Sequence, residues 1–168
     1  SKGNYAQSLA NYEEVIKIYK DNNNSNGCPV YTKSGICAYK MGTYDKAAKY
    51  LKNDVNSTFR NEETLYYLGM TYNKLDNLSM EMITLQDYVD IYPNGKYLDS
   101  VNELLFYVYS KSDNYDKAIS LWPNINKNYD ALSTYLYVND QVGNTESCFL
   151  IVEELIELNP ESTVALLW

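Results

Sequence analysis

The sequence predicts an all-α fold, a right-handed α-α superhelix built from about four to five helix pairs. Short polar turns recur at near-regular distances along the chain, which is typical of a repeat protein. Between these turns, apolar residues follow the three- and four-residue spacing of an amphipathic helix. Only 7 Gly and 4 Pro occur in 168 residues, almost all of them between the periodic segments. The chain should therefore contain many helices and few loops.

The turns define the repeat. The residues that follow successive turns are 39, 34, 37 and 30 positions apart. They are Tyr5, Tyr44, Leu78, Tyr115 and Thr145. A second set of breaks lies between these turns, at residues 21–27, 56–61, 93–95, 122–124 and 159–160. Because proline just past a helix end stops the helix from continuing, the two sets of breaks together indicate two helices in each repeat.

The individual helices follow from these breaks. We expect them at residues 5–20, 29–41, 44–55, 62–75, 79–92, 97–110, 115–122, 128–141 and 145–158, with a last one beginning near 161. Helices of this length are marginal alone in water, so stacking of consecutive pairs must bury their apolar stripes. We interpret residues 1–168 as a fragment containing a single domain. Its expected units are 1–27 (half a unit), 28–61, 62–95, 96–127, 128–160 and 161–168 (truncated).

The helix pair at residues 62–95 carries a recognisable pattern. Its first helix contains Leu65, Leu68, Gly69 and Tyr72 in order, and Pro93 closes the unit. This pattern resembles the tetratricopeptide repeat, whose first helix has a bulky residue, Leu, Gly and Tyr, and whose second helix has Ala, an aromatic residue and Pro. The resemblance extends more loosely over the whole chain and implies an α-solenoid.

The pair departs from the family pattern at two positions of its second helix. Glu81 stands where the family has Ala, and Leu85 stands where it has an aromatic residue.

Small residues at fixed positions predict close helix contacts. Gly35 and Gly69 are separated along the chain by one period of the family repeat. We expect Gly35, Gly69 and Ala47 where two helices approach closely, because larger side chains would push the helices apart. Phe106 and Leu136 replace this glycine in the later pairs, so packing there must differ. We attribute the short spacing before Thr145 to a helix ended early at Pro123.

Composition excludes several classes of function. A net charge of −8 and a pI near 4.5 disfavour nucleic acid, whose binding depends on Lys and Arg. The chain has no His, so Ser–His and Cys–His centres cannot form, and the three cysteines, Cys28, Cys37 and Cys148, have no His to complete a zinc site. No glycine-rich nucleotide loop occurs. We expect neither an enzyme nor a bound cofactor or metal.

Three acidic features have simpler explanations than chemistry. Residues 21–27 are similar to a calcium loop, but the glycine comes one place late and Thr32 stands where the closing Glu is required. We expect a helix-connecting turn there. The pairs Glu13–Glu14, Glu62–Glu63 and Glu153–Glu154 lie on amphipathic helices, where solvated helix faces explain them. No run approaches the roughly 20 apolar residues of a membrane span, so we expect no membrane insertion.

The 19 tyrosines exceed what helix packing needs. The resemblance implies that the first helix of each pair lines a concave groove that binds a protein or peptide. Transferred onto this chain, the lining is Thr32, Ile36, Tyr39, Tyr66, Met70, Asn73, Tyr107, Ser110, Ser133 and Tyr137. It lacks the Lys and Asn pattern that clamps a terminal carboxylate in some relatives. An aromatic and polar groove suits an extended or helical segment with apolar anchors.

We therefore expect a protein-interaction scaffold. The alternatives are a structural spacer or self-association module of a larger protein, and an accessory domain of an enzyme outside this fragment. The apolar stretch 164–168 leaves the last helix uncapped, which favours self-association through the ends.

Charge offers a competing explanation of binding. Residues 61–168 contain 17 acidic and 5 basic side chains, so their carboxylates could attract a basic partner to an outer face. Residues 92–122 are also similar to repeats in periplasmic envelope-assembly proteins. We expect a bacterial protein, either cytoplasmic or periplasmic.

Overall fold

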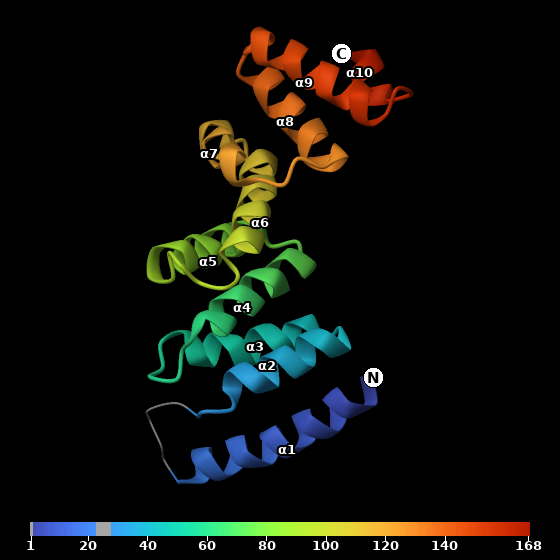
Figure 1. Ribbon diagram of the computed structural model, residues 1–168. Coiled ribbons are helices and arrows are strands. Elements are labelled where there is room, and N and C mark those ends of the chain that lie inside the picture. Colours follow the sequence, from blue (N-terminus) through green and yellow to red (C-terminus); the bar gives the residue numbers. More distant parts are fainter. Residues whose placement is uncertain (1, 23–27) are drawn as a thin grey trace. The chain divides into compact units, whose positions relative to one another are not determined.

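The computed structural model describes residues 2–22 and 28–168, and these residues form helices and turns without a β-strand (Figure 1). The chain divides into two compact units, Ser1–Leu98 and Asp99–Trp168. The first unit contains α1 (Lys2–Asp21), α2 (Tyr31–Met41), α3 (Tyr44–Val55), α4 (Glu62–Lys74) and α5 (Leu78–Ile91). From the unit boundary onward follow α6 (Leu98–Lys111), α7 (Tyr115–Leu121), the 3-10 helix η1 (Trp122–Asn124), α8 (Tyr129–Gln141), α9 (Thr145–Leu158) and α10 (Thr163–Leu167).

The all-α helical-repeat fold is confirmed. Each expected helix is present, and its bounds lie close to those expected from the sequence. The helix before Pro123 does end early: α7 has 7 residues and passes into η1, which contains the proline. The residues that are similar to a calcium loop lie largely outside the described part of the chain. The assignment of residues 1–168 to one domain with six repeat segments stays a prediction.

The polar turns between paired helices share one backbone conformation. Gly42, Asp76, Asp113 and Gly143 have φ values of 81°, 53°, 57° and 72°. This left-handed conformation is open to Gly and tolerated by Asp, and it commonly ends a helix. After α2, the amides of Gly42 and Thr43 bond to the carbonyls of Tyr39 and Ala38. The recurrent Gly or Asp seen in the sequence therefore marks the point where the chain reverses between the two helices of a pair.

Several helices begin at an Asn or Ser whose side chain accepts a backbone N–H. Asn61, Asn77 and Asn128 accept from the third residue beyond them, and so does Ser162. Such caps satisfy amides that have no partner inside the helix. The high Asn content thus has a local structural use at the starts of α4, α5 and α8.

Two glycines permit close packing in the first unit. A Cβ atom added at Gly35 would overlap with Leu51 Cγ, and one added at Gly69 would overlap with Leu85 Cδ2. In each pair the leucine belongs to the second helix, and its spacing along the chain from the glycine is the same. Both leucines are completely buried. The expected close contacts at Gly35 and Gly69 are therefore present, with a leucine of the partner helix filling the space above each glycine.

Aromatic packing replaces this arrangement in the second unit. Phe106 is fully buried, and its ring centroid lies 5.7 Å from that of Trp122. Along the chain, Trp122 follows Phe106 at the spacing that separates each leucine from its glycine in the first unit. Trp122 stacks on Tyr135 at 3.9 Å with an interplanar angle of 9°. Leu136 occupies the next equivalent position and belongs to a cluster that includes Val152. The expectation that packing differs at Phe106 and Leu136 is correct.

A buried carboxylate joins three helices of the first unit. Asp54, at the end of α3, is 1% exposed. Its Oδ2 accepts from the backbone N–H and the hydroxyl of Thr32 on α2, at 3.1 and 2.7 Å, and its Oδ1 accepts from Ser57 Oγ. The Thr32 hydroxyl also lies 2.6 Å from Thr64 Oγ1, which completes the capping box of α4. Three hydrogen bonds offset the loss of hydration that burial of this group entails.

Replacing Gly69 by Leu should destabilise the protein by about 1–3 kcal/mol through overpacking against Leu85. Chemical denaturation measures this loss. In a Leu85→Ala background the same substitution should be less harmful, because the opposing side chain is gone. A loss below about 0.5 kcal/mol in the otherwise unaltered protein would contradict the close contact.

Replacing Tyr72 by Phe should leave the free energy of unfolding unchanged or raise it. Tyr72 Oη is buried, and the described residues offer it no hydrogen bond. Such a hydroxyl carries a desolvation penalty of about 1–3 kcal/mol. Tyr88→Phe is the matched control, because the hydroxyl of the buried Tyr88 donates to Glu62 and accepts from the amide of Tyr97. The control should lose stability, and a loss at Tyr72 as large as that at Tyr88 would contradict the assignment.

Candidate binding groove

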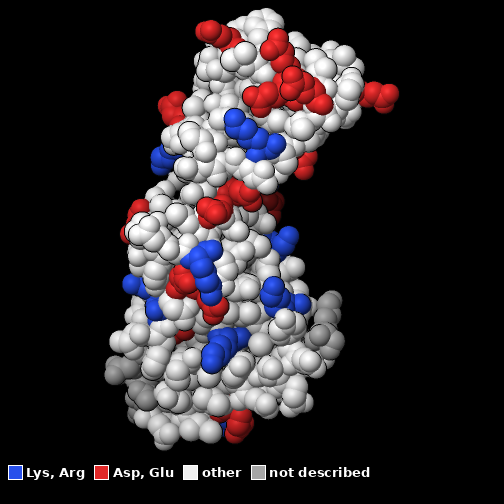
Figure 2. All heavy atoms as spheres, viewed as in Figure 1, with Lys and Arg blue, Asp and Glu red and all other residues white. Residues whose placement is uncertain are grey.

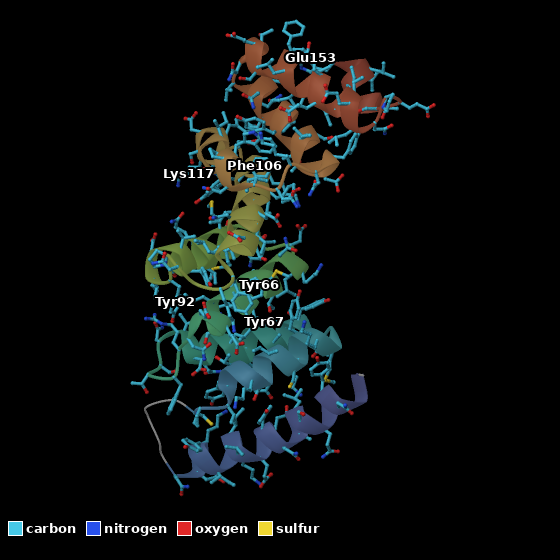
Figure 3. All side chains as sticks on the ribbon, in the orientation of Figure 1. Tyr66, Tyr67, Tyr92, Phe106, Lys117 and Glu153 are labelled. Carbon is cyan, nitrogen blue, oxygen red and sulfur yellow. The ribbon has the colours of Figure 1, made fainter. Side chains whose placement is uncertain are left out.

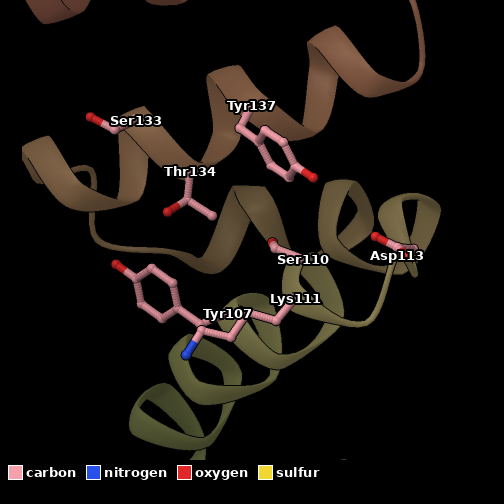
Figure 4. A pocket seen from close by; sticks show the side chains of 7 residues that line it. All are labelled: Tyr107, Ser110, Lys111, Asp113, Ser133, Thr134 and Tyr137. Carbon is pink, nitrogen blue, oxygen red and sulfur yellow. The ribbon is translucent and has the colours of Figure 1, made fainter. Parts of the chain in front are cut away.

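Four of the ten sequence-predicted residues line one cavity in the second unit. Tyr107 and Ser110 come from α6, and Ser133 and Tyr137 come from α8 (Figure 4). The cavity has a volume of about 420 Å³ and is also lined by Lys111, Asp113 and Thr134. The first helices of two successive pairs thus face the same cavity.

A second cavity adjoins the first. It has a volume of about 330 Å³ and shares Ser133 and Tyr137 with it. Its other lining residues come from α8, α10 and the residue after α10: Leu136, Asp140, Val164, Leu167 and Trp168. We call the two cavities together the α8 groove. Tyr137 borders both of its halves, so it lies at the centre of the groove.

Tyr137 is exposed but held in place. It is 48% exposed, and its hydroxyl lies 3.2 Å from that of Tyr115, whose ring packs edge-on against it at 6.0 Å. The Tyr115 hydroxyl in turn donates to Asp113 Oδ1 at 2.7 Å. The hydrogen bond to Tyr137 and then that to Asp113 raise the pKa of Tyr115. An aromatic side chain fixed in this way offers contact area at little entropic cost.

Tyr107 lies on the α6 side of the first cavity. Burial, followed by the charges of Asp130 and Glu103, raises the pKa of its hydroxyl. The smaller polar side chains of the lining are bonded within their own helices. The hydroxyl of Ser110 donates to the Phe106 carbonyl, and that of Ser133 donates to the Tyr129 carbonyl. The serine hydroxyls are therefore bonded within their own helices, and the serines add little contact area. The tyrosines provide most of the contact area of the groove.

The predicted tyrosines of the first unit form a different arrangement, in which Tyr39 and Tyr66 pack on Tyr67 (Figure 3 labels Tyr66 and Tyr67). The ring centroids of Tyr39 and Tyr66 lie 5.6 and 5.2 Å from that of Tyr67. Tyr66 also stacks on Tyr97 at 4.0 Å with parallel planes. Tyr97 belongs to the segment between α5 and α6, so the chain itself covers one face of Tyr66. Ile36 and Met70, also predicted for the lining, are half-buried on α2 and α4.

Two other predicted lining residues bond to buried carboxylates. Thr32 is buried and bonded to Asp54, as described above, so its side chain connects α2 to its neighbours. Asn73 Nδ2 donates to Glu81 Oε1 at 2.9 Å. Glu81 is 1% exposed, in the position where the family has Ala. The departure at Glu81 noted in the sequence thus places a buried carboxylate beside Asn73.

The segment before α6 is hydrogen-bonded to two glutamates at the start of α4. Glu62 Oε2 accepts from Tyr88 Oη and from the Lys96 backbone N–H, at 3.1 and 2.9 Å. Glu63 Oε1 accepts from Lys96 Nζ and from Tyr97 Oη, at 3.1 and 3.2 Å. The expectation that Glu62–Glu63 forms only a solvated face is therefore wrong. Their carboxylates face a loop that lies beyond α5 in the sequence, which the helical pattern of α4 does not reveal.

Sequence reasoning missed eight of the twelve residues that line the groove. Lys111, Thr134 and Asp140 lie close to predicted positions on the same helices, so a wider helical face would have included them. Asp113 lies in the turn between α6 and α7, outside the helical faces from which the prediction was made. For Leu167 and Trp168 the sequence predicts only an uncapped apolar end.

The arrangement defines a class of protein: an all-α solenoid of helix pairs. Residues 63–95 match the family model of the tetratricopeptide repeat, the same pair that carries the closest sequence pattern. The chain therefore contains a tetratricopeptide repeat and has the fold of tetratricopeptide-repeat proteins.

Solved structures agree on this fold. YrrB, a TPR protein with an unusual peptide-binding site, matches with a TM-score of 0.78 and 17% identity, over 98% of this chain and 82% of its own. MamA matches with a TM-score of 0.72 and 20% identity, over 95% and 85%. PilF of Pseudomonas aeruginosa matches with a TM-score of 0.64 and 16% identity, over 92% and 70%. At these identities the likeness concerns the fold.

A curated relative matches more locally. Sperm-associated antigen 1 of Rattus norvegicus is 24% identical over 104 residues. The match covers 60% of this chain and 11% of the relative, so this chain corresponds to about a tenth of that protein's length.

Among residues 2–22 and 28–168, every helix is too short or too polar to span a bilayer. The same ranges contain no group of three or more His, Cys, Asp or Glu side chains placed to hold a metal ion. Cys28, Cys37 and Cys148 are buried and not joined in disulfides.

The raised pKa of Tyr88, whose hydroxyl donates to Glu62, should make the free energy of unfolding fall at high pH. Burial raises the pKa of Tyr88, the hydrogen bond from the Tyr97 amide lowers it, and the hydrogen bond to Glu62 raises it. Together they raise the pKa of Tyr88 from about 10 to about 12. The folded state therefore keeps this proton longer than the unfolded state does. The stabilisation is complete below pH 10 and is lost as the pH rises from 10 through 12, by up to about 1.4 kcal/mol per pH unit.

Chemical denaturation between pH 8 and 12 checks this sign. Tyr88→Phe should show a shallower decline of the unfolding free energy over this range than the unaltered protein. Parallel declines of the two proteins would contradict the raised pKa.

Proposed function

We propose that this chain is a protein-interaction scaffold that binds a peptide or protein segment in the α8 groove. The observation that carries the proposal is the pair of adjoining cavities that share Tyr137. Cavities lined by aromatic and apolar side chains, with a few polar groups, are typical of ligand sites. The tetratricopeptide-like fold supports the general class, and the peptide-binding site of YrrB is a precedent for this kind of ligand.

The second unit supports the proposal more strongly than the first, because its predicted lining residues leave more surface open to a partner. In the first unit Tyr66 stacks on Tyr97 of the same chain, and Thr32 is buried. These contacts stabilise the helix pairs and leave less surface for a partner. In the second unit Tyr137 is 48% exposed beside open volume. Large aromatic side chains at the centre of an interface commonly dominate its binding energy. We therefore assign the anchoring roles to Tyr107 and Tyr137.

A second candidate function is self-association, and exposed apolar side chains of α9 and α10 favour it. Phe149, Leu150 and Leu158 are 61%, 59% and 56% exposed, and Leu166 and Leu167 are 71% and 87% exposed. Exposed apolar patches commonly mark interaction surfaces. Light scattering over a range of concentrations tests this candidate. A mass that rises with concentration and returns to the monomer value in Phe149→Ser supports it, and a constant monomer mass rejects it.

Tyr107→Ala and Tyr137→Ala should each weaken binding of a groove-directed peptide by about 1–3 kcal/mol, as expected for a moderate hot spot. The probe is a fluorescent peptide selected from a random dodecapeptide library on the unaltered protein, measured by fluorescence polarisation. The matched control is Tyr5→Ala, because Tyr5 is an exposed tyrosine of α1 in the other unit. Circular dichroism establishes that each variant is folded. Unaltered affinity in both groove variants would contradict the proposal.

A further inference from the structure

We infer that the α8 groove recognises a cationic segment, one that carries apolar anchors next to Lys or Arg. This inference rests on the proposed function and adds the chemistry of the partner. It also combines two explanations that the sequence left separate, an aromatic groove and an acidic surface.

The net charge of the protein resides in one unit. Residues 99–168 contain 11 Asp and Glu and 3 Lys, a formal charge of −8, whereas residues 1–98 contain 11 of each sign. Figure 2 shows acidic side chains gathered over the part of the chain that Figure 1 labels α9 and α10. The unit with the α8 groove therefore attracts cations, and the other unit is neutral in sum.

Among the residues that the structure describes, no Lys or Arg forms an ion pair with a carboxylate of this unit. The ion pairs of the described residues join Lys46 to Glu13, and Lys96 to Glu62 and Glu63, all in the first unit. Two of the three lysines of the second unit face aromatic rings instead. Lys117 Nζ lies 5.3 Å from the ring centroid of Tyr109, and Lys127 Nζ lies 5.7 Å from that of Trp122. The eleven carboxylates thus keep their charge available to a partner.

Carboxylates also line the groove itself. Asp113 borders the first cavity and Asp140 borders the second, and Tyr137 borders both. Each is bonded through Oδ1 to an aromatic side chain, Asp113 to the Tyr115 hydroxyl and Asp140 to the Trp168 indole N–H at 3.1 Å. Within the described residues, Oδ2 of both groups accepts no hydrogen bond. Lys111 is the one basic residue among the lining of the two cavities, so their charge is negative.

This combination suits Lys and Arg side chains. Their aliphatic stems can pack on the tyrosine rings, their cationic heads interact favourably with aromatic faces, and the heads can reach the free carboxylate oxygens. An acidic segment would instead bring like charges together in the groove, which opposes binding. Long-range attraction would also speed encounter with a cationic segment, and this effect weakens as salt shortens the Debye length below about 10 Å.

The experiment is a selection of random displayed dodecapeptides on the unaltered chain at 50 mM NaCl, followed by sequencing. Enriched peptides are then synthesised and their dissociation constants measured at 50 and 300 mM NaCl. We expect enriched peptides with net positive charge and at least two apolar residues. Their affinity should fall about tenfold or more between the two salt concentrations.

Two charge variants test whether the cationic part of the peptide binds in the groove. The groove variant is Asp113→Asn with Asp140→Asn, and the control is Glu153→Gln with Glu154→Gln on the exposed face of α9 (Figure 3 labels Glu153). Both remove two negative charges. The groove variant should weaken peptide binding about fivefold or more, and the control less than about twofold, because short-range attraction exceeds screened long-range attraction. Equal weakening by the two variants would overturn the placement of the cation in the groove.

The outcomes separate this inference from the proposed function. Enriched peptides that are neutral or acidic, and that lose binding in Tyr137→Ala, would overturn the cationic preference and leave the groove function standing. Enriched peptides that bind Tyr137→Ala as well as the unaltered protein, or the absence of enriched peptides, would overturn both. Thermal melts of every variant must match that of the unaltered protein, so that a lost signal reports binding.

Discussion

The close approach of paired helices over a glycine is the constraint on which the first unit depends. At Gly35 and Gly69 no Cβ atom fits, because Leu51 and Leu85 of the second helices occupy that space. A side chain at either glycine would move the second helix, and with it the next first helix that packs on it. Since each repeat contacts mainly its neighbours, the position of every first helix depends on such contacts. The tyrosines of α2 and α4 lie side by side because these contacts are short.

In the second unit the same position is filled by large side chains. Phe106 and Trp122 occupy the places of the glycine and the leucine, and Tyr135 stacks on Trp122. Helices separated by aromatic rings cannot approach as closely as helices that meet at a glycine. The cavities of the α8 groove lie in this unit, between α6, α8 and α10. The change from glycine to aromatic packing thus coincides with the change from a filled tyrosine cluster to an open groove.

The carboxylates of the two units also differ in what they bind. In the first unit Asp54, Glu62 and Glu81 accept hydrogen bonds from residues of other helices or loops, and these bonds stabilise the stack. In the second unit Asp113 and Asp140 bond to aromatic side chains at the edge of the groove and form no ion pair with the described lysines. Carboxylates therefore stabilise the stack in the first unit and border the groove in the second.

The all-α repeat fold, the approximate helix bounds and the early end of α7 could be predicted from the sequence, because they depend on local signals: apolar periodicity, caps, turn residues and proline. The sequence also placed Tyr107, Ser110, Ser133 and Tyr137 on first helices, where the structure gathers them around one cavity. Three contacts could not be predicted in this way: Tyr66 stacks on Tyr97, Thr32 is buried against Asp54, and Asp113 lines the groove. These contacts join residues from different helices and turns, and helical periodicity specifies which face of a helix is buried but not which neighbour covers it.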